Sequence, residues 1–191
     1  MKRRPLAVAI LLACTIALAA CNSENPRPSS SVSRDPAPSS SASASPVPSA
    51  TKALTPAEQD LQSAGEAITE YWRVLDEVAS DPKVSLNVLA TVARSQALEQ
   101  WQTTLAADRG QGVEQQGRAQ VRDAVASSGD GKSFAVTACV DFSEVDVVDA
   151  SGKSVVKAGR PVAQRYSYVV QKAPEGFFVT EDLFKGQPCT S

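Results

Sequence analysis

The chain has 191 residues, 42% of them hydrophobic and 21% charged, but these residues are not evenly spread. All ten aromatic side chains lie between Tyr71 and Phe184, so a packed core of ordinary size can form only from about Pro56 onward. The sequence contains no histidine, which excludes histidine-based catalytic triads, imidazole metal sites and a simple pH switch near neutrality. We therefore expect one small globular domain preceded by segments of another kind.

The charge of this expected domain argues against one class of partner. From Pro56 to Ser191, 13 Lys and Arg residues face 19 Asp and Glu residues, a net charge of −6. The basic residues are scattered singly, whereas nucleic-acid phosphates reward clustered cations. We expect no nucleic-acid partner.

The first twenty residues are typical of an export signal. A basic start, residues 2–4, precedes an uncharged apolar run over 6–20, which is too short to span a bilayer comfortably. The run closes on Leu18-Ala19-Ala20-Cys21. This order resembles the bacterial lipoprotein signal, in which such a lipobox ends the apolar run.

The resemblance implies cleavage of residues 1–20 and attachment of a diacylglyceryl group to Cys21. The two acyl chains of this group, which palmitate would label, imply stable anchoring on the outer, extracytoplasmic face of the cell membrane. The alternative is an ordinary secretory signal that leaves Cys21 as a free thiol.

Residues 21–55 are predicted to be a disordered tether behind this anchor. Of the 34 residues from Asn22 to Thr55, eleven are Ser, six are Pro and five are Ala. Such a composition buries too little apolar surface to offset the chain entropy. The segment is either a plain solvated spacer or, like other Ser/Thr/Pro-rich stalks, a glycosylated one.

Two helical stretches are predicted at the start of the domain, residues 56–191. Thr55-Pro56-Ala57-Glu58 combines a capping box with proline at the first helical position, and Asp81-Pro82 ends the helix. A second stretch is capped by Ser85, is expected to break near 93–95, and ends at Gly110 and Gly112.

Antiparallel strands are predicted after the helices, because the apolar period changes to two. The expected strands cover about 113–125, 133–142, 145–148, 153–156, 161–172 and 177–184. Turn residues at 129–132, 151–152 and 174–176 separate them, and Gly117 is expected to bend the first. The fold class is therefore α+β, with N-terminal helices on a curved antiparallel sheet of four or more strands.

This order of elements resembles the nuclear transport factor 2-like, or cystatin-like, cone fold, and more narrowly the small actinobacterial lipoproteins with such a domain. The residues that carry the resemblance are Tyr71-Trp72 with Leu75 and Asp76, Arg109-Gly110, Cys139-Val140-Asp141 and Gly176-Phe177-Phe178-Val179. It implies a sheet wrapped around the first helix, which encloses a pocket in some relatives and a filled core in others. It does not supply a function.

Two cysteines, Cys139 and Cys189, remain after the signal is removed and Cys21 is acylated. In an oxidising exterior compartment a disulfide is the default, and it would fix the C-terminus to the sheet. A redox-active pair would need a Cys-x-x-Cys motif or groups that lower a thiol pKa, which are missing. Two thiols without histidine offer too few zinc ligands, and we expect no metal and no cofactor.

Carboxylates inside the cone are the candidates for acid–base chemistry. Side chains along a strand alternate between its two faces. This alternation places Glu181 on the inner face with Val179 and Leu183, and Asp123 between two inward valines. It places Asp141 on the outer face with Cys139. The alternative for Glu181 and Asp123 is that a bulge or fraying near the strand ends turns their side chains to water. The aromatic residues considered as ligand-binding candidates, with Glu181, are Tyr71, Trp72, Trp101, Tyr166 and Tyr168, and their alternative role is in the core.

The sequence thus favours a non-catalytic domain on a flexible stalk that binds an envelope protein or a small apolar ligand. One alternative is a small cone-fold enzyme, of isomerase or dehydratase type, that uses Glu181 or Asp123. Another is a structural accessory of an envelope complex with an exposed apolar patch. No catalytic residue is assigned, and neither the ligand nor the oligomeric state can be read from the sequence.

Overall fold

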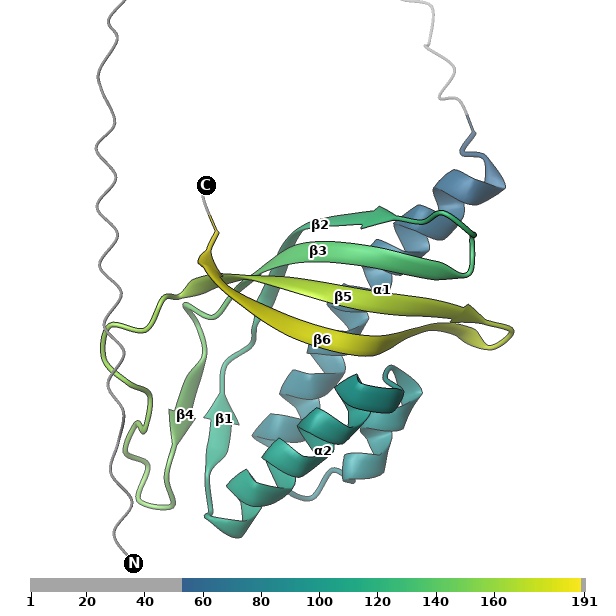
Figure 1. The fold of residues 1–191 in the computed structure, drawn as a ribbon. Coiled ribbons are helices and arrows are strands. Elements are labelled where there is room, and N and C mark those ends of the chain that lie inside the picture. Colours follow the sequence, from purple (N-terminus) through teal and green to yellow (C-terminus); the bar gives the residue numbers. More distant parts are fainter. Residues whose placement is uncertain (1–52, 190–191) are drawn as a thin grey trace, which may run out of the picture. The chain divides into compact units, whose positions relative to one another are not determined.

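A computed structural model describes residues 53–189. Three helices come first, followed by six strands (Figure 1). The helices are α1 (Pro56–Ser80), the short 3₁₀ helix η1 (Leu86–Thr91) and α2 (Ser95–Gly110). The strands are β1 (Glu114–Gln116), β2 (Gln120–Ser127), β3 (Ser133–Asp141), β4 (Asp146–Val148), β5 (Ala163–Ala173) and β6 (Gly176–Pro188).

The main sheet has four antiparallel strands in the order β2-β3-β5-β6, and β1 pairs with β4 in a separate two-stranded ribbon. In Figure 1 the strands of the main sheet curve across α1, while η1 and α2 lie under β6 and the ribbon continues beside the helices. Helices followed by a curved antiparallel sheet are the α+β architecture expected from the sequence, and this prediction is confirmed.

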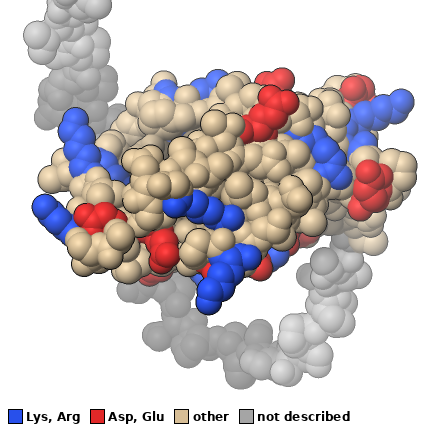
Figure 2. All heavy atoms as spheres, turned by 90° about the horizontal axis from the view of Figure 1, so that it is seen from below, with Lys and Arg blue, Asp and Glu red and all other residues tan. Residues whose placement is uncertain are grey.

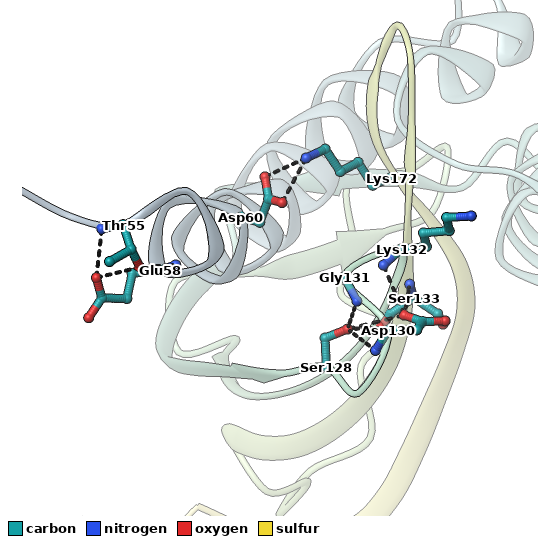
Figure 3. Close-up of polar contacts among 9 residues, drawn as sticks. All are labelled: Thr55, Glu58, Asp60, Ser128, Asp130, Gly131, Lys132, Ser133 and Lys172. Carbon is teal, nitrogen blue, oxygen red and sulfur yellow. Dashed lines mark hydrogen bonds and ion pairs between the residues drawn. The ribbon is translucent and has the colours of Figure 1, made fainter.

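The ends of α1 follow the predicted signals. The backbone N–H of Thr55 donates to Glu58 Oε2 over 2.7 Å, and the N–H of Glu58 donates to Thr55 Oγ1 over 3.3 Å (Figure 3). This reciprocal capping box satisfies two N–H groups that the first helical turn leaves without partners. The helix ends at Ser80, directly before Asp81-Pro82.

The second helical stretch divides as predicted. Ser85 caps η1, accepting from the N–H of Asn87 over 3.2 Å, and the chain leaves the helical conformation from Val92 to Arg94. In this break Val92 and Arg94 exchange backbone hydrogen bonds with Val179 of β6, each over 2.9 Å. The break therefore fixes α2 to the edge strand of the sheet.

Three strand predictions need correction. The strand expected over 113–125 is split at Gly117, where φ is +76° and a Cβ atom would lie 1.8 Å from the carbonyl oxygen of Glu144, so glycine is required for the bend. The expected return strand over 153–156 is only an isolated bridge between Val148 and Ser154, because β4 pairs with β1 instead. The last strand continues to Pro188.

The core lies between α1 and the inner face of the sheet. On β3 the even-numbered side chains point inward as predicted, and Phe134, Val136, Ala138 and Val140 are almost fully buried. Their partners from other elements are Ala64, Ile68, Tyr71, Leu75, Val78, Tyr168, Val170 and Val179. This continuous apolar contact fixes the sheet on the helix.

At one end of the core, the hairpin between β2 and β3 lies near the start of α1 (Figure 3). Asp130 Oδ1 accepts from the backbone N–H groups of Lys132 and Ser133, over 2.9 and 2.8 Å, which closes the turn. Lys172 on β5 pairs with Asp60 on α1 at 2.7 Å. The ion pair therefore joins β5 to the start of α1 at this end of the domain.

The predicted disulfide between Cys139 and Cys189 is present, with 5.9 Å between the two Cα atoms. It joins the middle strand β3 to the residue after β6, across a sequence separation of 50. Closing a loop of this length stabilises the folded chain by roughly 4 kcal/mol in the chain-entropy model. Asp141, two residues further along β3, pairs with Arg122 at 2.8 Å.

Candidate functional site: an aromatic cavity and a buried carboxyl

The candidate site is a partly open cavity of about 250 Å³ between the helices, the β1–β4 ribbon and the start of β5. Its apolar lining is Trp72, Val78, Ala79, Trp101, Leu105, Val113, Phe142, Val145, Val147 and Tyr166, and its polar lining is Asp108, Arg109, Gln115, Arg160 and Gln164. A concave, mostly apolar site with a few polar groups is the usual form of a small-molecule site.

Trp72 lies at the centre of the aromatic part of the cavity. Its ring packs edge-to-face against Trp101, Phe142 and Tyr166, at centroid distances of 5.7, 5.3 and 5.6 Å. This geometry stabilises aromatic pairs beyond the effect of buried area alone. Four rings from α1, α2, the end of β3 and β5 therefore form a rigid apolar surface.

A carboxyl that the sequence analysis did not select lies behind these rings. Asp182 on β6 is 2% exposed, and its Oδ2 accepts from Tyr71 Oη and from Trp101 Nε1, each over 2.9 Å. Its Oδ1 is buried and has no hydrogen-bond partner in residues 53–189. Burial raises the pKa of Asp182, and the bonds from Trp101 and Tyr71 oppose that rise.

The prediction that Glu181 points inward is wrong, because a bulge changes the parity of β6. Val169 pairs with Glu181 but Val170 pairs with Val179, so Thr180 is an extra residue on β6. As a result Glu181 is exposed and Asp182 faces the core. The backbone of Asp182 is fixed as well, since its N–H donates to Gln96 Oε1 over 2.8 Å.

The prediction for Asp123 is wrong for the same kind of reason. The pairing of β2 with β3 shifts between Arg122 and Val125, and Asp123 has a φ of +52°. Asp123 is exposed, and Val125, which was expected to point inward, is 65% exposed. Ala124 is the side chain that packs against the core instead.

The aromatic ligand-binding candidates divide into two groups. Trp72, Trp101 and Tyr166 line the cavity, whereas Tyr71 and Tyr168 are buried in the core next to it. Tyr168 Oη accepts from Trp72 Nε1 over 2.8 Å, and burial together with the nearby Asp182 raises the pKa of both core tyrosines. Tyr71 and Tyr168 therefore support the cavity rather than line it.

Asp76, part of the motif that suggested the cone fold, is a second buried carboxyl. Its Oδ1 accepts from Gln115 Nε2 over 2.7 Å and its Oδ2 accepts from the N–H of Ala119 over 3.0 Å. Burial raises its pKa, and these two hydrogen bonds oppose the rise. Asp76 therefore fastens the chain on both sides of Gly117 to α1.

The two arginines of the cavity have different surroundings. Arg109 Nη2 donates to the carbonyls of Val78 and Val84, over 2.9 and 2.8 Å, and so ties α2 to the end of α1. Arg160 Nη2 donates to the carbonyl of Val145 over 2.5 Å. Neither guanidinium lies within 4.0 Å of a carboxylate oxygen in the described part of the chain.

Among residues 53–189 no group of three or more potential metal ligands occurs, and no helix there is long and apolar enough to cross a bilayer. Cys21, the signal over 1–20 and nearly all of the predicted tether lie outside the described residues. On the face shown in Figure 2, basic and acidic side chains are interspersed and most of the surface is neutral.

No family model and no curated protein matches the chain. Among solved structures, the intermembrane-space region of the chloroplast protein ARC6 is similar, with a TM-score of 0.51 and 16% identity over 65% of this chain and 95% of that one. A protein assigned as the beta subunit of an aromatic-ring-hydroxylating dioxygenase from Novosphingobium aromaticivorans has a TM-score of 0.44 and 12% identity, over 68% and 94%.

A protein of unknown function from Nostoc punctiforme, described as having a cystatin-like fold, has a TM-score of 0.40 and 10% identity, over 69% of this chain and 92% of that one. At identities this low the similarity concerns the fold, and it assigns no activity to the cavity.

Proposed function

We propose that the protein is an extracytoplasmic lipoprotein whose cone domain binds a small, largely apolar ligand without transforming it. Cys21 carries the lipid anchor, and the chain between Cys21 and the helix cap at Thr55 is the flexible stalk. The observation that carries the binding role is the 250 Å³ cavity with its surface of four packed aromatic rings. The anchor rests on the lipobox sequence and on the lipoprotein resemblance.

The size and lining of the cavity favour a small molecule over a protein partner. An apolar cavity of about 150 Å³ holds benzene, so 250 Å³ suits roughly ten non-hydrogen atoms. The aromatic surface is preformed, since Trp72 and Trp101 are held by hydrogen bonds to Tyr168 and Asp182. Preformed sites bind with a smaller entropic cost than sites that must be ordered.

Co-purification tests the binding role. The mature chain from Asn22, exported behind an ordinary secretory signal, should retain a ligand of roughly 150 Da, visible in native mass spectrometry and lost on denaturation. A Val147→Trp variant, which fills the cavity wall, should lose that mass. Val125→Trp, the same change at a position 65% exposed, should keep it. Equal ligand content in both variants would place the ligand elsewhere.

Palmitate labelling tests the anchor. A Cys21→Ala variant of the full chain should lose its label and its partition into detergent, because the thioether that carries the lipid can no longer form. Unchanged detergent partitioning would contradict the lipoprotein assignment and leave the binding role standing.

One observation supports an enzymatic function as the second candidate. Asp182 combines a raised pKa with an oxygen that has no partner among residues 53–189, and such carboxyls serve as general acids or bases when substrate reaches them. If the wild-type chain converts the co-purified ligand and Asp182→Asn does not, the function is catalysis and not binding alone. An unchanged ligand in both proteins agrees with binding alone.

A further inference from the structure

We infer that the ligand of the aromatic cavity is an aryl or compact alkyl carboxylate, whose charge is bound by Arg160 and by the hydroxyl of Tyr166. This inference rests on the proposed binding function and names the chemical class of its ligand. It is carried by one wall of the cavity, formed by the start of β5 and the loop before it.

The first step is the unused hydrogen-bonding capacity of Arg160. A guanidinium has five N–H donors, and in residues 53–189 only Nη2 of Arg160 is engaged, with the carbonyls of Val145 and Phe142. The side chain is partly buried and has no carboxylate partner among those residues. A partly desolvated cation without a counterion favours an anionic ligand.

The second step is the hydroxyl of Tyr166, which lines the same wall and has no hydrogen-bond partner among the described residues. Burial, with Asp182 adding to it, raises the pKa of Tyr166 to about 12, while the charge of Arg160 opposes that rise. Tyr166 is therefore a protonated donor, and it lines the same cavity as Arg160. A guanidinium and a phenol together match the acceptor atoms of a carboxylate.

The remaining charged groups of the cavity leave this assignment in place. Arg109 is occupied by three backbone carbonyls, those of Val78, Asp81 and Val84. Asp108 is the carboxyl on the lining, but it comes from α2 and not from the wall that carries Arg160 and Tyr166. The aromatic surface around Trp72 then receives the apolar body of the ligand.

Intrinsic fluorescence provides the test, because both tryptophans of the chain, Trp72 and Trp101, line the cavity. The mature exported chain is titrated with 3-phenylpropanoate and with its neutral analogue 3-phenylpropanamide. We expect the carboxylate to bind at least about tenfold more tightly than the amide, as a charge-assisted hydrogen bond allows. The same affinity for both probes would overturn the inference.

Variants test whether the preference for the carboxylate over the amide comes from Arg160 and Tyr166. Arg160→Gln should reduce the preference for the carboxylate to within about twofold while affinity for the amide persists, and Tyr166→Phe should reduce it less. Arg160→Lys, which keeps the charge but loses the planar fork, should retain part of it. The matched control is Arg165→Gln, an identical loss of charge on β5 at a residue outside the cavity lining, and it should change nothing.

A preference that survives Arg160→Gln with the fold intact by circular dichroism would also overturn the inference. Where native mass spectrometry finds a co-purified ligand but neither probe binds, the carboxylate class fails and the binding function stands. Where no ligand co-purifies and neither probe binds, both fail.

Discussion

Two buried carboxyls of the domain, Asp76 on α1 and Asp182 on β6, differ in how their oxygens are satisfied. Both are nearly inaccessible, with exposures of 4% and 2%. Each oxygen of Asp76 accepts one hydrogen bond, from Gln115 and from Ala119. At Asp182 both donors, Tyr71 and Trp101, bind Oδ2, and Oδ1 has no partner within residues 53–189.

This difference separates a structural role from a candidate functional one. Asp76 is saturated by the chain on either side of Gly117, so its carboxyl holds the ribbon and the start of β2 on α1. Asp182 positions two aromatic side chains, one of which lines the cavity, and retains an acceptor that no described residue uses. Unsatisfied buried groups are rare, because they cost free energy.

The largest effect is expected from Asp182→Ala. The change leaves Tyr71 Oη and Trp101 Nε1 without an acceptor and opens a void behind the aromatic rings, so the free energy of unfolding should fall by about 3 kcal/mol. Urea denaturation followed by Trp fluorescence measures it. Asp182→Asn, which keeps an acceptor oxygen and nearly the same volume, should lose much less, and equal losses would show that the two donors require the carboxylate itself.

A smaller and more local effect is expected from Asp76→Ala. Gln115 Nε2 and the N–H of Ala119 lose their acceptor, but both residues are only partly buried and water can replace part of it. We expect a loss of about 2 kcal/mol. Hydrogen exchange should accelerate in β1 and at Ala119 and stay slow in β3. Uniform acceleration over the whole domain would contradict the local role.

The pH dependence of stability sharpens the comparison further. An unfolded Asp titrates near pH 4, whereas burial holds the pKa of folded Asp182 above that value. From about pH 4 up to the folded pKa, the unfolded chain has released a proton that the folded chain keeps, so the free energy of unfolding falls as pH rises. Asp76 and Asp108 are raised as well and contribute in the same direction.

Replacing Asp182 by Asn removes its share of this slope. The free energy of unfolding of the variant should therefore fall less steeply than that of the wild type as pH rises above about 4. Urea denaturation at a series of pH values measures both curves, and parallel curves would show that Asp182 ionises in the folded state as readily as in the unfolded chain.

Helix ends and the core face were predictable from the sequence, because each depends on neighbouring residues. Thr55 with Glu58 and Ser85 act within one turn of the chain. On β3 the inward set from Phe134 to Val140 follows the expected alternation, although Cys139, which forms the disulfide, is buried too. The disulfide was predictable for another reason, since Cys139 and Cys189 allow only one pairing once Cys21 is assigned to the lipid.

The interior carboxyl was not predictable, because its position depends on a bulge. One extra residue, Thr180, moves Glu181 outward and Asp182 inward, and its presence is settled by the pairing of β6 with β5. Likewise, the carboxyl of Asp76 is buried only because the ribbon folds over α1 at Gly117. The alternation of residues along one strand does not predict these long-range contacts.

The smallest effect, and the sharpest check on the bulge, is expected from Glu181→Gln. Glu181 is exposed on β6, so the change should leave the melting temperature within about 2 °C of the wild type and should not alter binding of a carboxylate probe. The adjacent Asp182→Ala, one residue further along the same strand, should be strongly destabilising. Thermal denaturation of the two variants side by side therefore reports which residue the bulge turns inward. A marked change in the stability of Glu181→Gln would show that Glu181 is the inward carboxyl, as strict alternation along β6 assigns.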